Sequence, residues 1–520
     1  MKLNVILGWS SALCLGAGAL QAQETNELES LKKQLKQATE NFEKATQEQR
    51  RVIESLSRKV ETLEQARTNP PPVASTKVEE HLDHHDHKHA EEPTRPLHFS
   101  YGPAHVDLGL MGTFAVGGST ASDIEGGTQL GGHDPNQRGF TVQGVEASLS
   151  GEVEPHLRGN ISMAFSIDAG GDSIFELEEA WLETLSLPGN LQVRAGQVFT
   201  AFGRHNPTHL HEWGFVDVPL VNGSFLGPDG LRNPGARLAW RTPVPFRSEL
   251  SLGVQNSQGE TASSFRTEGQ AHGDEEGLPL AYRHSDNDRG VKHFSDLLLS
   301  PRYAVSFDLT DSQELTAGAS AAFGPNSRGG EGAGATDTQI YGADLLWKWK
   351  LDNHSHRFVA WQTEAMLRKY DAGAFNWDED GDGAVSPGEV VDVDTGLPAL
   401  LSGETLTDYG LYSQLLYGFR ERWVAGLRFD YLTGHRADYE RRNLSFEGDA
   451  LGRDPLRDRR WRLSPNLTWY PSQFAKVRLQ YNYDDRRDMG VDHSVWLQFE
   501  FAFGGHSPHE GKSDDHSHGH

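Results

Sequence analysis

The feature that most constrains the fold of this chain is an alternation of apolar and polar residues, repeated in many segments between residues 98 and 503. In segment 461–469, tryptophan, leucine and proline occupy the odd positions and polar side chains the even ones, and segments 423–431 and 477–483 repeat the pattern. A period of two places alternate side chains on opposite faces of a β-strand. One face of each segment is therefore apolar with aromatic residues near its ends, as in a transmembrane β-barrel. A soluble sandwich would show the same alternation with its apolar face turned inward.

The number of segments and the spacing between them favour the barrel. Tight turns alternate along the chain with generally longer loops rich in Gly, Asp and Asn, as in outer-membrane barrels, whereas a sandwich has no reason to segregate its loops. We therefore predict an all-β fold, a sixteen-stranded antiparallel transmembrane β-barrel preceded by an α-helical coiled coil. The expected strands lie near residues 104–116, 138–154, 158–168, 175–187, 191–199, 234–241, 245–256, 295–308, 313–323, 336–351, 356–370, 405–420, 422–432, 457–470, 475–485 and 491–503.

Composition excludes two other classes of protein. The mature chain lacks a segment of about 20 apolar residues, which a spanning helix needs. The formal net charge of −26 argues against a nucleic-acid binder, which needs clustered Lys and Arg. The one cysteine, Cys14, lies in the N-terminal apolar run, so we expect no disulfide in the mature protein.

The N-terminal segments predict where in the cell the protein is located and that it forms an oligomer. We interpret residues 1–22 as a cleaved signal peptide, with an uncleaved anchor as the alternative. Residues 24–66 carry heptads typical of a periplasmic coiled coil, the alternative being a single solvated helix. A Pro/His-rich linker (67–97), the barrel (98–503) and a His-rich tail (504–520) follow. This order predicts a homotrimer in the outer membrane of a Gram-negative-type cell, in contact with its lipid and with both termini in the periplasm.

Two segments resemble known outer-membrane proteins. The strand 495–503, which ends on Phe503, resembles the C-terminal strand of Gram-negative barrels, although here a tail continues to His520. The stretch 193–203 (VRAGQVFTAFG) is similar to a strand-to-loop segment of the phosphate-selective porin family. This resemblance implies a sixteen-stranded trimeric barrel and a passive diffusion channel. It does not imply phosphate selectivity, because no run of lysines matches the phosphate-binding ladder of that family.

The third long loop, from Thr200 to Asn233, is dense in charged and imidazole side chains, and we expect it to fold into the barrel and narrow it. Late strands point basic residues to their polar face, so a basic wall facing acidic loop residues would set a transverse field across the water path. The alternative is that these charges pair with one another. The predicted constriction comprises Arg204, His205, His209, His211, Glu212, Asp217, Asp229, Arg232, Arg428, Arg460, Arg462, Lys476 and Arg478.

Two histidine tracts flank the predicted barrel and favour weak, adaptable binding of zinc, copper or nickel. A solubilising role is the alternative. The tracts contain His81, His84, His85, His87 and His89 before the barrel and His506, His509, His516, His518 and His520 after it.

The most specific motif is an EF-hand-like loop between Asp378 and Glu389 that predicts a calcium site outside the cell. Carboxylates stand at positions one, three and five, glycine at six and glutamate at twelve, a spacing that wraps Ca²⁺ with oxygen ligands. Pro387 and Gly388 disfavour the helix that normally follows, and a chance match is the alternative. The expected ligands are Asp378, Asp380, Asp382, the Ala384 carbonyl, Ser386 and Glu389.

Together these patterns predict a porin for passive diffusion of small hydrophilic solutes or ions. The alternative is a metal-binding outer-membrane receptor or surface protein that uses the barrel as an anchor. We expect no enzyme, because nucleophile-elbow, phosphate-loop and His-Glu-x-x-His motifs are missing from the sequence.

Overall fold

The computed structural model describes residues 97–504, except 102–103, 154–155, 267–277, 286–290, 329–335, 352–356 and 379. The chain divides into two units, residues 1–91 and 92–520, and the described residues belong to the second. The predicted signal peptide, coiled coil and histidine tracts therefore lie outside the described residues.

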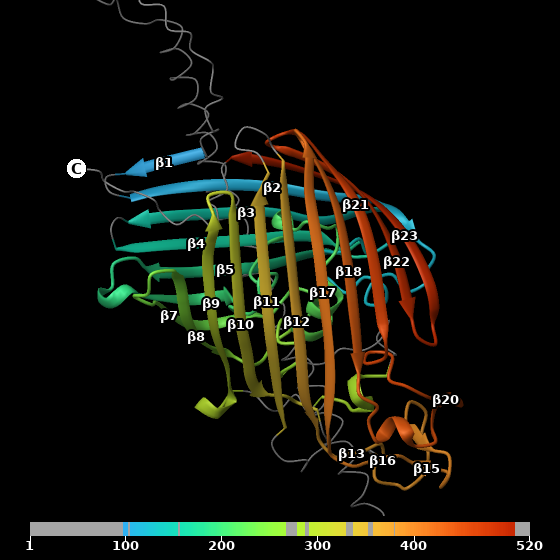
Figure 1. Ribbon diagram of the computed structural model, residues 1–520. Helices are drawn as coiled ribbons and strands as arrows, with labels where there is room; N and C mark the ends of the chain where they lie inside the picture. The colour runs from blue at the N-terminus through green and yellow to red at the C-terminus, as the bar shows by residue number, and fades with distance from the viewer. Residues whose placement is uncertain are drawn as a thin grey trace, which may run out of the picture. The chain divides into compact units, whose positions relative to one another are not determined.

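Sixteen antiparallel strands close into a barrel (Figure 1), as the alternation predicts. Each strand pairs with its neighbours in sequence, and the last strand pairs with the first along Gly109–Ser119, which closes the ring. The barrel strands are β2 (Ala104–Ser119), β3 (Gly139–Val153), β4 (Leu157–Ile167), β5 (Ser173–Thr184), β6 (Leu191–Phe199), β7 (Arg232–Arg241), β8 (Arg247–Asn256), β9 (Leu297–Thr310), β10 (Gln313–Pro325), β11 (Asp337–Lys350), β12 (Phe358–Ala372), β17 (Glu404–Arg420), β18 (Trp423–Gly434), β21 (Arg460–Ser472), β22 (Ala475–Arg486) and β23 (Gly490–Gly504).

A further strand, β1 (Leu97–Tyr101), was not expected from the sequence. It pairs with Ala104–Leu108 of β2, the part of β2 that lies beyond the end of β23. In this way β1 supplies backbone partners to an edge that the closing strand leaves open.

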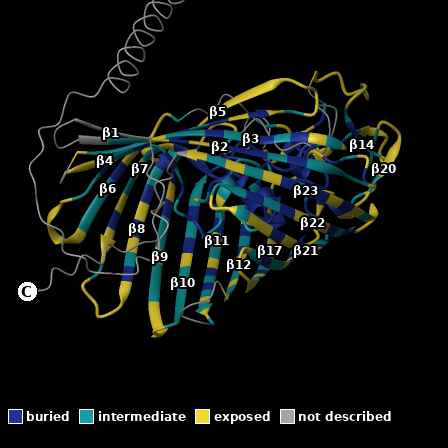
Figure 2. Ribbon diagram, turned by 90° about the horizontal axis from the view of Figure 1, so that it is seen from above, coloured by how far each residue is buried: buried dark blue, intermediate teal, exposed yellow. Residues whose placement is uncertain are grey.

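The outward face of the barrel is apolar. Along β22, Leu479 and Tyr481 are exposed while the intervening Gln480 and Asn482 are buried, and Figure 2 shows such banding on several strands. Aromatic pairs lie near both ends of β21: Trp469 stacks on Trp423 at one end, and Trp461 on Tyr483 at the other. The apolar side chains therefore point outward, which excludes the sandwich alternative.

The two ends of the barrel differ. At one, the turn end, connections of two to seven residues join the strands, such as 311–312 and 421–422. At the other, the loop end, five connections are long: 120–138, 200–231, 257–296, 373–403 and 435–459. Loops 168–172 and 487–489 at the loop end are short, so the segregation has exceptions.

Three of the long loops pack on one another beyond the strands. Loops 257–296, 373–403 and 435–459 share a hydrophobic core that includes Tyr282, Trp377 and Tyr439. Short strands strengthen two of these loops. Within loop 373–403, β13 (Phe375–Asn376) pairs with β16 (Leu400–Leu401). A four-stranded sheet of β15 (Leu397–Pro398), β14 (Val390–Asp392), β19 (Leu444–Phe446) and β20 (Asp449–Leu451) joins loop 373–403 to loop 435–459.

Among the described residues, helices are short, and none is long and apolar enough to cross a membrane.

Candidate functional site

The loop between β6 and β7 runs inside the barrel, as predicted from its position and polarity. We call residues 200–231 loop L3; it contains the short helix α2 (Leu220–Leu226). At its start, the backbone N–H groups of Arg204 and His205 donate to Oε1 of Glu364 on β12, at 2.9 and 2.7 Å. Loop L3 therefore leaves β6 and reaches the wall formed by β12.

Further along, loop L3 contacts the strands near the C-terminus. Lys476 Nζ donates to the carbonyl of His211 at 3.0 Å, and Arg478 donates to the carbonyl of Trp213 at 2.8 Å. Val216 N–H donates to the Gln480 side chain at 2.9 Å. These hydrogen bonds tie loop L3 to β22, so the loop spans from one wall of the barrel to another.

Most of the predicted basic wall is paired with carboxylates. Asp217 of loop L3 lies between Arg428 and Arg462, at 2.6 and 3.0 Å, and all three side chains are at most 1% exposed. Arg462 also contacts Asp484, at 2.6 Å. Burial alone would raise the pKa of the Asp217 carboxyl, but the two guanidinium groups hold it below its usual value. Arg428 and Arg462 are therefore paired with carboxylates, as the alternative interpretation expects of them.

Two further residues of the wall are paired with carboxylates, whereas Arg478 donates to neutral acceptors on Trp213, Thr468 and Gln498. Arg460 contacts Asp484 at 3.1 Å and donates to the Gly127 carbonyl at 2.7 Å, so loop 120–138 covers this part of the wall. Lys476 contacts Glu500 at 2.5 Å.

Of the other loop residues of the predicted constriction, His205 and His211 are partly enclosed, whereas Glu212 is exposed. Burial lowers the pKa of His205 to about 3, and the nearby Arg428 acts in the same direction. Burial likewise lowers the pKa of His211 to about 4, and its Nδ1 lies 2.6 Å from Glu146 Oε2. Glu212 caps the turn that begins at His209, accepting its backbone N–H at 3.1 Å.

A second group, of carboxylates, lines β5 opposite loop L3. The register between β4 and β5 pairs Ser162 with Glu179 and Met163 with Leu177, so Glu178 is an extra residue in β5. A bulge of this kind turns two successive side chains to one face. Glu178 and Glu179 are both buried, whereas Leu177 is exposed on the outer face.

His209 of loop L3 lies between these two glutamates. Its Nδ1 is 3.1 Å from Glu178 Oε2 and its Nε2 is 3.2 Å from Glu179 Oε2. Burial alone would lower the pKa of His209, but the two carboxylates raise it well above its ordinary value. His209 is therefore a protonated imidazolium that donates to one carboxylate from each ring nitrogen.

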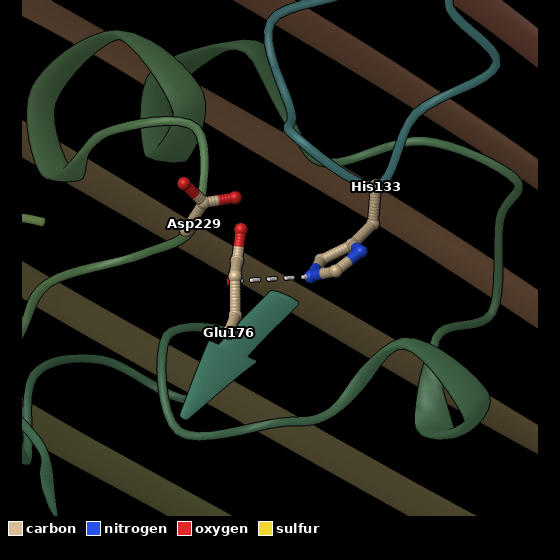
Figure 3. A group of neighbouring side chains, drawn as sticks. All are labelled: His133, Glu176 and Asp229. Atoms are coloured by element: carbon tan, nitrogen blue, oxygen red, sulfur yellow. Dashed lines mark ion pairs between the residues drawn. The ribbon is translucent and has the colours of Figure 1, made fainter. Parts of the chain in front are cut away.

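Next to this pair, His133 of loop 120–138, Glu176 of β5 and Asp229 of loop L3 converge from three parts of the chain (Figure 3). Their ligand atoms lie within 4.8 Å of one another. Arg232, at the start of β7, donates to Glu176 and lies 4.0 Å from Glu178. The structure thus brings His209, Asp229 and Arg232 of the predicted constriction together with carboxylates of β5 and with His133.

Sequence reasoning missed Glu176, Glu178, Glu179 and His133. One signal was present: the run Glu-Leu-Glu-Glu at 176–179 places three acids within a segment expected to form a strand. A regular strand would have turned Glu178 and Glu179 to opposite faces, so the cluster depends on the bulge.

The calcium motif lies in loop 373–403, at the loop end. The carboxylates of Asp378, Asp380 and Asp382 cluster within 4.8 Å, and Gly383 has the positive φ of 70° that its position in the motif needs. Glu389, the expected ligand at position twelve, accepts the Ser386 backbone N–H at 2.8 Å. Calcium binding stays a prediction.

Comparisons with known proteins give few relatives. No family model matches the chain. A protein of Aquifex aeolicus (strain VF5) described as uncharacterized is 29% identical over 396 residues, covering 73% of this chain and 72% of its own.

Solved structures with a similar fold include the outer membrane channel DcaP of Acinetobacter baumannii (TM-score 0.48, 14% identity, covering 78% of this chain and 99% of that one). Another is an anion-selective porin from Comamonas acidovorans (TM-score 0.42, 10% identity, 77% and 100%). Because both TM-scores are below 0.5, we base the function on the geometry of this chain.

Proposed function

We propose that this protein is an outer-membrane channel through which small hydrophilic solutes or ions diffuse passively, with loop L3 as its constriction. The observation that carries the proposal is the closed barrel with apolar side chains outside and charged side chains inside. Closure satisfies the backbone groups of every strand, which a sheet in lipid requires. A sixteen-stranded barrel is wide enough for an aqueous channel unless something narrows it.

Charges on the inner face support water access from the turn end. Arg247 on β8, Asp308 on β9 and Glu314 on β10 form ion pairs of 2.8 and 3.1 Å, yet their side chains are 46%, 73% and 38% exposed. They share the strand face that carries buried polar residues further along, such as Ser300. The inner face is therefore hydrated near the turns and covered by loops toward the other end.

Two further proposals, on the oligomer and on the family, rest on the sequence. The heptads of residues 24–66 would hold three copies together in the periplasm. The resemblance of residues 193–203 to the phosphate-selective porin family supports a diffusion channel and leaves the solute open.

Conductance tests the proposal directly. The purified full-length protein, added to a planar bilayer in potassium chloride, is expected to produce stepwise current. In a salt gradient, Asp308→Asn should shift the reversal potential toward anion preference, because it removes a hydrated negative charge from the inner face. Asp438→Asn, in an exposed pair at the loop end, is the matched control.

The absence of current steps, both without and with added zinc or phosphate, would overturn the channel and favour the anchor interpretation. The observation behind that second candidate is the burial of Arg428, Arg462 and Asp217 under loop L3. Zinc and phosphate added to the salt gradient would then separate a blocked channel, which a ligand could open, from a barrel that conducts nothing.

A further inference from the structure

We propose that His133, Glu176 and Asp229 form a binding site for one divalent transition-metal cation inside the barrel, with Zn²⁺ as the probe. The site is separate from the histidine tracts and from the calcium motif. It needs the folded barrel but no solute flux, so it stands whether or not the protein conducts.

The orientation of His133 is that of a metal ligand. Its Nδ1 lies 2.9 Å from the Gln143 carbonyl, which can only accept, so Nδ1 carries the proton. Gln143 donates in return to the His133 carbonyl at 2.7 Å and fixes the loop. This backbone contact leaves Nε2 aimed at the carboxylates, the arrangement that orients ligating histidines in metalloproteins.

His133 Nε2 makes no hydrogen bond, although the residue is only 6% exposed. Asp229 Oδ1 is likewise buried without a hydrogen-bond partner. A buried polar atom without a hydrogen-bond partner is unfavourable, so two such atoms in one cluster of residues indicate a ligand between them.

The separations suit a shared cation better than direct contact. Nε2 of His133 is 3.9 Å from Glu176 Oε2 and 3.7 Å from Glu178 Oε1, both too long for hydrogen bonds. Ligand atoms about 2.0–2.2 Å from a tetrahedral zinc ion lie roughly 3.4 Å apart. Small movements of these side chains would therefore enclose the ion. A cavity of about 30 Å³ lined by His133, Glu178 and Asp229 leaves space for a water as the remaining ligand.

The charge of the surroundings favours a cation. Among the described residues near the site, carboxylates outnumber the cationic groups, which are Arg232 and the imidazolium of His209. The nearby carboxylates are Glu146, Glu176, Glu178, Glu179 and Asp229. The excess negative charge raises the pKa of His133 against the effect of its burial. It also acts, with burial as the larger cause, to raise the pKa of Asp229. A mixed set of imidazole and carboxylate ligands selects Zn²⁺ and similar ions over Mg²⁺ or Ca²⁺.

Zinc titration of the full-length protein tests the site after zinc binding by the two histidine tracts has been removed. The histidines of both tracts are replaced by asparagine, and zinc binding is then measured by calorimetry. We expect one zinc ion per chain, with no competition from a large excess of Ca²⁺. X-ray absorption at the zinc edge should report an imidazole nitrogen together with carboxylate oxygens.

In the same background, His133→Asn is expected to abolish this binding event, because asparagine can still donate to the Gln143 carbonyl but offers no Nε2. His156→Asn, at an exposed turn, should leave binding unchanged. Zinc bound equally by parent and His133→Asn would overturn the proposal, as would the absence of zinc from the parent.

If His133→Asn fails to fold, judged by heat-dependent gel mobility, Asp229→Asn provides the second variant. An at least tenfold weaker affinity then supports the site, and an unchanged affinity overturns it.

Discussion

At the scale of single residues, Asp217 has the strongest structural role in the basic wall. Asp217→Asn would leave two buried guanidinium groups, Arg428 and Arg462, without the charge that lies between them. Breaking a buried pair in this way costs about 3–5 kcal/mol. We expect a loss of that size in the free energy of unfolding, measured by urea titration in detergent.

Asp438→Asn is the control for that experiment, because the Asp438–Arg441 pair is largely exposed and such pairs contribute about 0–1 kcal/mol. Equal losses in the two variants would mean that Asp217 does not hold the wall together.

His209 predicts a pH dependence. Its folded pKa is raised well above the ordinary value of 6.5, so its ion pairs stabilise the fold fully below pH 6.5 and progressively less as pH rises through the folded pKa. The destabilisation caused by His209→Gln should therefore be largest at pH 6 and shrink at alkaline pH. Unfolding midpoints of both proteins across pH 6–10 measure it, and a difference independent of pH would contradict a charged His209.

The residues of this site were predictable to different degrees. Asp217, His209 and Arg462 could be predicted from the sequence, because charged residues in a long loop and on the polar face of the strands are expected to face the inside of the barrel. Their pairing could not be predicted, because a period of two gives the face of a residue but not its partner across the barrel. His133 lies in another loop, and no local pattern connects it to Glu176 or Asp229.

At the scale of elements, alternation located all sixteen barrel strands to within a few residues of their observed ends. The alternation did not predict β1, which pairs with the edge of β2. It also did not predict the bulge at Glu178, because a bulge interrupts the period of two on which the prediction rests. The alternation also did not predict the short strands of loops 373–403 and 435–459, because two or three residues are too few to show a period.

Glu364 is the anchor for the start of loop L3. It accepts two backbone N–H groups of the loop and the hydroxyl of Tyr412, at 2.6 Å. Glu364→Ala should free this end of the loop and widen the water path. We expect faster proteolysis within residues 200–231 and a higher single-channel conductance, with Glu421→Ala in an exposed turn between β17 and β18 as the control. Unchanged conductance alongside faster proteolysis would show that loop L3 does not limit the current.

Loop 373–403 carries the calcium prediction. Clustered carboxylates at Asp378, Asp380 and Asp382 repel one another when empty, and a Ca²⁺ ion would draw them and Glu389 together. We expect calcium to slow protease cleavage in this loop of the intact protein, and Asp378→Ala to remove the effect. Asp449→Ala, in the neighbouring loop, is the control. Equal cleavage in calcium and in chelator would contradict the site.

At the scale of the whole molecule, assembly should depend on a segment that precedes the barrel in the sequence. Residues 24–66 carry the heptads, whereas the strands that close the barrel begin at Ala104. A heptad seam of this length stabilises an oligomer through apolar contacts between helices, because a lone helix of the same polarity is marginal in water. Removing residues 24–66 should therefore leave each barrel folded while weakening the trimer. Gel mobility of unheated samples measures association, and heat-dependent mobility measures the fold of each barrel. A deletion of residues 67–90 is the matched control, because it shortens the chain and keeps the seam. An equally stable trimer without residues 24–66 would show that the apolar outer faces of the barrels carry the assembly.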